Sequence, residues 1–170
     1  MSDSPSYLGS FLRHGYRDPD VGLFEAAWDQ LEAEYLNRIE TAASSFEGWR
    51  DRFRAAAAET LRLVEEHPLE ARFLAVDSIT AGDFGRSRQR RLSAHLASLI
   101  DAAREEIPEP DQVPAVTAQW ILAIFFDCIY RHLAGDAGGR LEDQLPELMF
   151  LAISPYFGTE AGRRELFDEA

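Results

Sequence analysis

The sequence predicts an all-α domain, and three observations lead to this prediction. Apolar residues recur at spacings of three and four along most of the chain, as on one side of a helix. Runs of alternating apolar and polar residues, typical of strands, are missing, and proline and glycine fall between the periodic segments. With 170 residues, the chain is about one domain long and can bury a core without disulfides. We therefore expect a single helical bundle.

The first two long helices are recognised by their ends. An N-cap residue followed by a proline begins the first helix at Asp18, and we expect this helix to reach about Ala43. The second helix is predicted to begin near Ser45 and to end at His67, because Pro68 follows. By helical spacing, the inner faces of the two helices carry Leu23, Phe24, Ala27, Trp28, Leu31, Tyr35 and Ile39, and Trp49, Phe53, Ala56, Ala57, Thr60, Leu61 and Val64.

The middle of the chain is predicted to hold a short helix, a long helix and a rigid connector. Residues 68–81 form a mostly apolar helix, which Gly82 is expected to close. The long helix is expected over residues 83–106, with Leu92, Leu96, Leu99 and Ile100 directed inward. It leads into the loop 108–114, which is stiff because it contains three prolines.

The last two predicted helices, residues 115–133 and 141–158, are apolar around most of their circumference instead of along one stripe. The glycine-rich loop 134–139 joins them, so we expect them to be antiparallel, and a charged tail, 159–170, follows. Because such helices must be covered on more than one side, we expect them to pair with a second copy as a four-helix bundle across a two-fold axis. The expected dimer interface consists of Leu122, Phe126, Tyr130, Leu145, Leu148, Met149 and Ala152.

Composition limits the partners and the compartment of the chain. The formal net charge of -13 repels phosphate, which argues against nucleic-acid binding by this chain alone. The single cysteine, Cys128, excludes an internal disulfide and lies in an apolar run, where a free thiol behaves as a small buried hydrophobe. With no signal peptide, this favours the reducing cytoplasm. No apolar run reaches the roughly 20 residues that cross a bilayer, so we expect no membrane partner.

The patterns that identify common enzymes are missing from the sequence. It has no glycine-rich phosphate loop, no nucleophile elbow and no cluster of histidine, cysteine and carboxylate residues at metal-ligand spacing. The four histidines, His14, His67, His95 and His132, lie on separate predicted elements. We therefore expect no catalytic residue, no metal site and no cofactor.

The order of elements resembles the C-terminal regulatory domain of TetR-family transcriptional regulators. Three segments carry the resemblance: residues 67–74, which lead into a small apolar helix; the basic entry to the next helix; and residues 144–158, QLPELMFLAISPYFG. The last is the most specific, since many members end their dimerisation helix with a similar Leu-Pro-Glu-Leu…Pro-Tyr-Leu-Gly phrase. The resemblance covers roughly residues 9–160 and implies a homodimer.

The N-terminal region departs from the family pattern. Family members begin with three short helices of a helix-turn-helix DNA-binding domain, whereas only about twenty residues precede the first long helix here. Residues 9–16, GSFLRHGY, look like the end of a recognition helix, and residues 18–24 resemble the phrase that follows it. A recognition helix without its supporting helices has no core, so we expect no direct DNA binding by this chain. The resemblance divides the chain into a remnant, 1–18, a regulatory domain, 19–158, and the charged tail, 159–170.

The resemblance also implies a function, which is to bind a small apolar or amphipathic effector inside the bundle. The pocket is then expected between the helices of residues 45–133, where aromatic side chains and isolated polar groups would line it. The expected ligand-binding residues are Trp49, Phe53, Phe73, Asp77, His95, Trp120 and Ile124, with Trp28 as an outer candidate. For each of these aromatics taken alone, ordinary core is the stronger interpretation.

The roles of two charged features, Asp77 and the basic run 86–91, allow more than one interpretation. Asp77, a carboxylate in an apolar segment, can face Arg72, Arg91, solvent or a ligand. The basic run 86–91 can hold an anion, although a solvated helix face is the simpler interpretation. Two alternatives to a regulatory domain also stay open: a headless TetR-like protein that acts as a heterodimerising adaptor or small-molecule binder, and a carrier or enzyme within a helical bundle.

Overall fold

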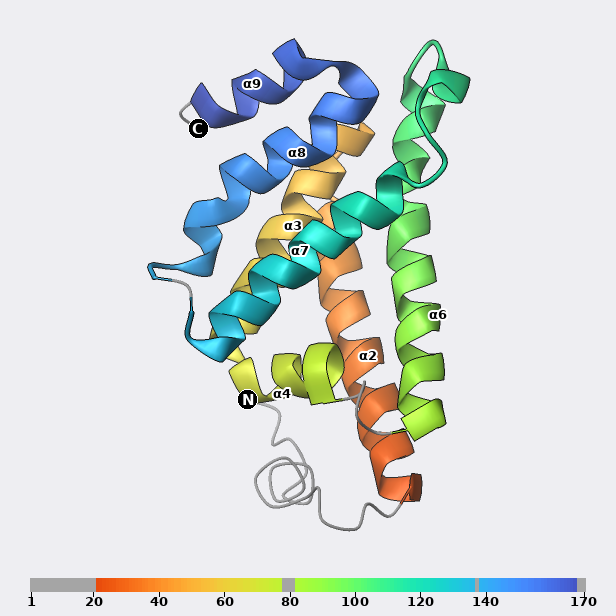
Figure 1. Cartoon of the computed structure of the whole chain (residues 1–170), viewed down its shortest axis with the longest axis vertical. Helices are drawn as coiled ribbons and strands as arrows, with labels where there is room; N and C mark the ends of the chain where they lie inside the picture. Colours follow the sequence, from red (N-terminus) through yellow and green to blue (C-terminus); the bar gives the residue numbers. More distant parts are fainter. Residues whose placement is uncertain (1–20, 78–81, 137, 168–170) are drawn as a thin grey trace.

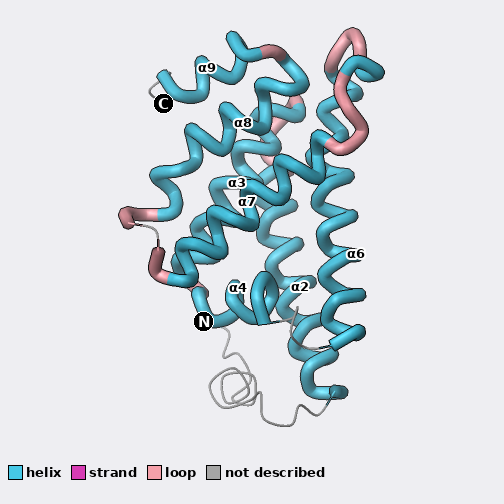
Figure 2. Tube along the Cα trace, viewed as in Figure 1, coloured by secondary structure: helices cyan, strands magenta, loops and turns pink. Residues whose placement is uncertain are grey.

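The computed structural model describes residues 21–77, 82–136 and 138–167, and over these ranges the protein is helical, without strands. This confirms the predicted all-α class (Figure 1, Figure 2). In chain order the α-helices are α2 (Val21–Ala43), α3 (Trp49–Glu66), α4 (Pro68–Arg72), α6 (Gly82–Asp101), α7 (Thr117–Ala134), α8 (Leu145–Phe157) and α9 (Thr159–Phe167). Between them lie a π-helix, η1 (Phe73–Asp77), and the 3-10 turns η2 (Ala102–Glu106), η3 (Pro110–Gln112) and η4 (Leu141–Gln144).

Neighbouring helices in the sequence are neighbours in space. Helix α2 packs on α3, α6 on α7, and α8 on α9. Figure 1 shows α7 crossing obliquely in front of α3, with the long helices α2 and α6 behind and beside it and α4 at their lower end. Because α2, α3, α6 and α7 surround a common interior, this is where the bundle can enclose a cavity.

Helix α3 begins four residues later than predicted, at Trp49 instead of Ser45. Gly48, which precedes it, has a φ of 69°, a left-handed conformation that glycine adopts readily. A carboxylate from a distant element then caps the helix, since the backbone N–H of Trp49 donates to Glu106 Oε1 at 2.6 Å. The predicted start of α2 at Asp18 lies outside the described residues, whereas its predicted end at Ala43 is confirmed.

The short helix predicted for residues 68–81 changes its winding after one turn. The α-helical part ends at Arg72 and the π-helix η1 continues to Asp77; residues 78–81 are not described. The predicted end of this helix at residue 81 lies outside the described residues, and Gly82, which has a φ of 75°, is the first residue of α6. Phe73 and Leu74, the first two residues of η1, are both buried.

A separate aromatic cluster lies at the end of α2 that meets η1. The Phe73 ring lies 5.0 Å from the Phe24 ring and 6.1 Å from the Trp28 ring, centroid to centroid, and Phe84 of α6 meets Phe24 edge-on at 5.8 Å. These rings form a core distinct from the larger one that α3, α7 and α8 share. Through this cluster, η1 and the first turn of α6 pack against α2.

Helix α8 is buried on more than one side, as the sequence predicted, but part of its cover comes from its own chain. The charged tail folds into α9 and packs against α8. Helices α8 and α9 approach closely at Gly162, because a Cβ atom there would clash with Ser154 Oγ and lie 3.0 Å from the backbone oxygen of Phe150. Glu165 of α9 is buried and forms ion pairs with Arg50 and Arg54 of α3. The tail is thus an integral part of the bundle.

Candidate functional site

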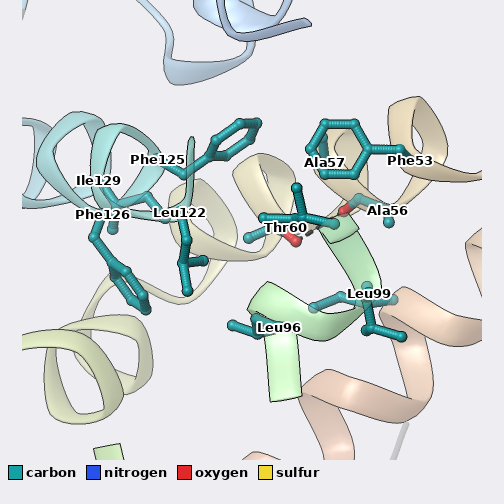
Figure 3. A pocket seen from close by; sticks show the side chains of 12 residues that line it. Phe53, Ala56, Ala57, Thr60, Leu96, Leu99, Leu122, Phe125, Phe126 and Ile129 are labelled. Carbon is teal, nitrogen blue, oxygen red and sulfur yellow. Dashed lines mark hydrogen bonds between the residues drawn. The ribbon is translucent and has the colours of Figure 1, made fainter. Parts of the chain in front are cut away.

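An apolar cavity of about 120 Å³ lies between α2, α3, α6 and α7. Figure 3 shows how it is built: Phe53, Ala56, Ala57 and Thr60 reach it from α3, and four residues of α7 lie opposite. Its complete lining is Ile39, Phe53, Ala56, Ala57, Thr60, Leu96, Leu99, Ile100, Leu122, Phe125, Phe126 and Ile129. Packing leaves this space because the α3 face turned toward it carries two alanines and a threonine in place of larger side chains.

A second cavity of about 90 Å³ adjoins the first in the direction of α4 and η1. Glu32 and Tyr35 of α2 contribute to its lining with their apolar parts only, because no polar atom of the wall faces the space. The walls of the two cavities share Ile39, Thr60, Leu96, Phe126 and Ile129. We call these two adjoining cavities the channel, and the five shared side chains its waist.

The channel offers few polar atoms to a ligand. The Thr60 hydroxyl donates its hydrogen to the backbone oxygen of Ala56 at 2.8 Å, which leaves only acceptor capacity toward the cavity. Tyr35 donates to the backbone oxygen of His67 at a long 3.5 Å. Burial raises the pKa of Tyr35 well above its usual range, and the negative charges of Glu70 and Glu34 add to the effect. Tyr35 therefore stays a neutral phenol.

Of the predicted ligand-binding residues, Phe53 alone lines the channel, and Trp49 lies directly behind it. The Trp49 and Phe53 rings stack in parallel, 4.8 Å apart between centroids, and the indole Nε1–H of Trp49 donates to the Leu99 backbone oxygen at 3.0 Å. Trp49 thus holds one wall of the first cavity in place without lining it.

The other predicted ligand-binding residues lie elsewhere. Phe73 is part of the aromatic cluster with Trp28, Asp77 forms an ion pair with Arg72 (3.5 Å), and His95 is on the exposed side of α6. Trp120 and Ile124 point outward from α7, with 65% and 39% of their surface exposed. The structure therefore does not bring the predicted set together, because an aromatic residue at helical spacing can serve core, channel or surface equally well.

The lining residues that the prediction missed are mostly aliphatic. Leu96 and Leu99 of α6 were expected to point inward, and Thr60 was placed on the inner face of α3, but nothing in the sequence separates these positions from ordinary core. A gap in packing depends on the summed volumes of side chains from four helices, which no single segment reveals.

The predicted dimer interface is divided between the interior and the surface. Leu148, Met149 and Ala152 are buried within the chain's own core, so they cannot meet a second copy in this arrangement. Leu122 and Phe126 line the channel, and Leu145 packs against the core. Tyr130 alone stands on the outer surface. Helix α8 packs against α9, α3 and α7 of the same chain, and these contacts contribute to its burial.

Different residues of the same two helices form the exposed apolar surface. On α7 the exposed positions Trp120, Ile124, Asp127 and Arg131 follow a helical stripe, and on the neighbouring helix α8 Leu151, 40% exposed, lies between the exposed Glu147 and Pro155. We call the side chains of Trp120, Ile124 and Leu151 the outer face. Exposed large apolar side chains on two neighbouring helices, a tryptophan among them, are a feature of interaction surfaces.

Other kinds of site find no support in the part of the chain that the structure describes. No three of its histidine, cysteine, aspartate and glutamate side chains are grouped to hold a metal ion. None of the described helices combines the length and the apolar character that crossing a bilayer requires. Comparisons of the chain with family models, curated proteins and solved structures gave no match.

Proposed function

We propose that this chain is the effector-binding and dimerisation domain of a TetR-like transcriptional regulator, and that its effector is a small apolar or amphipathic molecule. The observation that carries the proposal is the channel, an almost entirely apolar space between the helices of the bundle. The two cavities, of about 120 and 90 Å³, are of the size that holds one small ring or a short chain; a cavity of about 150 Å³ is known to take up benzene.

The first long helix would sense the ligand directly. Helix α2 contributes Ile39 to both cavities and Glu32, Tyr35 and Leu36 to the second. In the family that the sequence resembles, the corresponding helix follows the DNA-binding domain. A ligand in the channel would therefore touch the element that reports its presence.

The binding proposal is tested at Thr60, the polar residue of the waist. Thr60→Leu adds bulk where the two cavities meet and should weaken binding of an apolar ligand about tenfold, since overpacking costs roughly 1–3 kcal/mol. Thr60→Val keeps the shape and should bind as the wild type does. A panel of small apolar molecules is first screened by thermal stabilisation, and the hits are then titrated against all three proteins.

Circular dichroism and unfolding curves show whether each variant is folded. If no molecule in the panel raises the melting temperature of the wild type, or if Thr60→Leu binds the hits as tightly as Thr60→Val does, the channel is not the binding site.

We further propose that two copies associate through the outer face. Pairing across a two-fold axis brings the same residues from both copies together, so an apolar patch is complementary to itself. The flanking charges have both signs: Asp127 and Glu147 are acidic and Arg131 is basic. Self-association can therefore cover Trp120 and Ile124 without placing only like charges against each other.

Sedimentation of matched leucine variants tests this interface. The wild type should sediment as a dimer at micromolar concentration, and Leu151→Glu should weaken the dimer roughly a hundredfold, because it places a carboxylate in an apolar contact. Leu69→Glu is the control, since Leu69 of α4 is also exposed but lies off the outer face. A wild type that is monomeric under these conditions, or equal effects of the two variants, would rule the interface out.

A further inference from the structure

A groove of about 710 Å³ lies between α6 and α7 on the surface of the bundle. Figure 1 shows the two helices close together where α6 ends and diverging toward the start of α6. On α6 its wall includes a stripe of residues at helical spacings of three and four, which we call the groove stripe: Arg90, Ser93, Ala94, Ala97, Ser98 and Asp101. Because alanine and serine occupy the middle of the stripe, another helix can approach it closely.

The groove stripe is complementary to a reversed copy of itself. When two copies of α6 pair antiparallel, with the two-fold axis midway between Ala94 and Ala97, Arg90 of each copy faces Asp101 of the other. Each Ala94 then faces Ala97 of the second copy, and the two serines of the stripe also face each other. At 1.5 Å per residue the stripe is about 17 Å long, so an ion pair forms at each end and only small side chains lie between.

Both charged groups of the stripe can accept such a partner. Arg90 is exposed and forms no ion pair with any residue that the structure describes. Asp101 uses one oxygen within the chain, since its Oδ1 accepts from Arg104 Nε at 2.7 Å and from the Tyr156 hydroxyl at 3.0 Å. No described donor reaches its Oδ2, which therefore has capacity for an arginine. The remaining side chains of the groove wall are uncharged, so none of them repels either ion pair.

We infer that this groove binds α6 of a second copy, antiparallel and held by two Arg90–Asp101 ion pairs. The contact is separate from the dimer of the proposed function, because no residue of the outer face lines the groove. A short stripe of small side chains buries little apolar surface, so the contact should be weak, with a dissociation constant of roughly 100 µM. Leu122 and Phe126 line the groove as well as the channel, so the second copy would rest on a wall of the channel.

Sedimentation of the Leu151→Glu variant over a range of concentrations tests the inference, because contact through the outer face is weakened in this variant. It should still form dimers, with a dissociation constant of roughly 100 µM. Adding Arg90→Glu should weaken these dimers at least about tenfold, since both ion pairs become contacts between like charges.

The matched control is Arg91→Glu in the same variant. It makes the same change of charge at the next position of α6, which is also exposed but does not line the groove. It should change the dissociation constant by less than about twofold. Absence of dimers well above roughly 100 µM, or equal effects of the two arginine variants, would overturn the inference. A wild-type dimer at micromolar concentration would still support the outer face.

Mixing complementary variants gives a second measurement. Arg90→Glu and Asp101→Lys, each combined with Leu151→Glu, should associate weakly alone and about tenfold more tightly when mixed. The reason is that the acid replacing Arg90 in one copy faces the lysine replacing Asp101 in the other, while the unchanged Asp101 and Arg90 pair at the opposite end. No gain on mixing two folded proteins would contradict the antiparallel arrangement. If Asp101→Lys fails to fold because its two internal hydrogen bonds are lost, the comparison of Arg90→Glu with Arg91→Glu decides.

Discussion

At the scale of single residues, Glu165 is a charged side chain that the fold buries. Glu165 lies inside the contact between α9 and α3, whereas its partners Arg50 and Arg54 keep 39% and 38% of their side chains exposed. Removing the carboxylate and removing the arginines should therefore differ in their cost to stability. If Glu165 is removed, the arginines can turn to water, but if the arginines are removed, a carboxylate stays buried without a counter-charge.

This asymmetry predicts an order of stabilities. The double variant Arg50→Ala/Arg54→Ala should lower the free energy of unfolding by about 3–5 kcal/mol, the usual cost of stranding a buried charge. Glu165→Gln should cost less, about 1–2 kcal/mol, because the neutral amide leaves no stranded charge. Urea unfolding measures both. Arg86→Ala, which breaks the exposed pair with Asp83 (2.6 Å), is the control and should cost under about 1 kcal/mol. The account of α9 docking fails if Glu165→Gln is the more destabilising change.

At the scale of elements, the contact between α8 and α9 depends on one residue without a side chain. Gly162→Ala would place a methyl group 3.1 Å from the Phe150 ring as well as against Ser154 Oγ and the Phe150 backbone oxygen. The backbone oxygen cannot turn aside as a side chain can. We expect a loss of about 1–3 kcal/mol of unfolding free energy, although alanine otherwise favours a helix over glycine.

Gly138→Ala is the matched control for this substitution, because nothing lies within 4 Å of its Cβ position. Thermal unfolding of the two variants should show a lowered melting temperature for Gly162→Ala alone. Equal melting temperatures would show that α9 does not rest closely on α8.

The same elements show how far the sequence predicts the fold. Helix α8 is apolar around its circumference, so its burial on several sides could be predicted from residues 145–157. The element that covers α8 could not be predicted. Helix α9 makes its contacts through a glycine, Gly162, and a charged residue, Glu165, and neither is typical of a buried helix. By composition, these residues indicate a flexible and solvated segment; tertiary packing overrides that local signal.

The channel was predictable only in part for a related reason. Helical spacing correctly places Thr60, Leu96 and Ile100 on inward faces, and all three line the first cavity. Spacing does not show where four inward faces fail to fill the space between them. It also cannot tell Trp49, which supports the channel wall, from Trp120, which stands on the surface.

At the scale of the whole molecule, α7 connects the two proposed interactions. Its inner side supplies Leu122, Phe126 and Ile129 to the channel, and its outer side supplies Trp120 and Ile124 to the outer face. A ligand that shifts α7 would therefore act on the dimer contact, and the dimer would act on the channel by the same coupling energy. Helix α7 thus has two proposed roles. The central question is whether an apolar ligand binds on the inner or the outer side of α7.

Nuclear Overhauser effects between bound 1-octanol and methyl-labelled protein answer this question most directly. The channel predicts contacts from the octanol chain to the methyl groups of Leu96 and Ile129, which belong to the waist. Contacts confined to the methyl groups of Ile124 and Leu151 would place the ligand on the outer face and contradict the account.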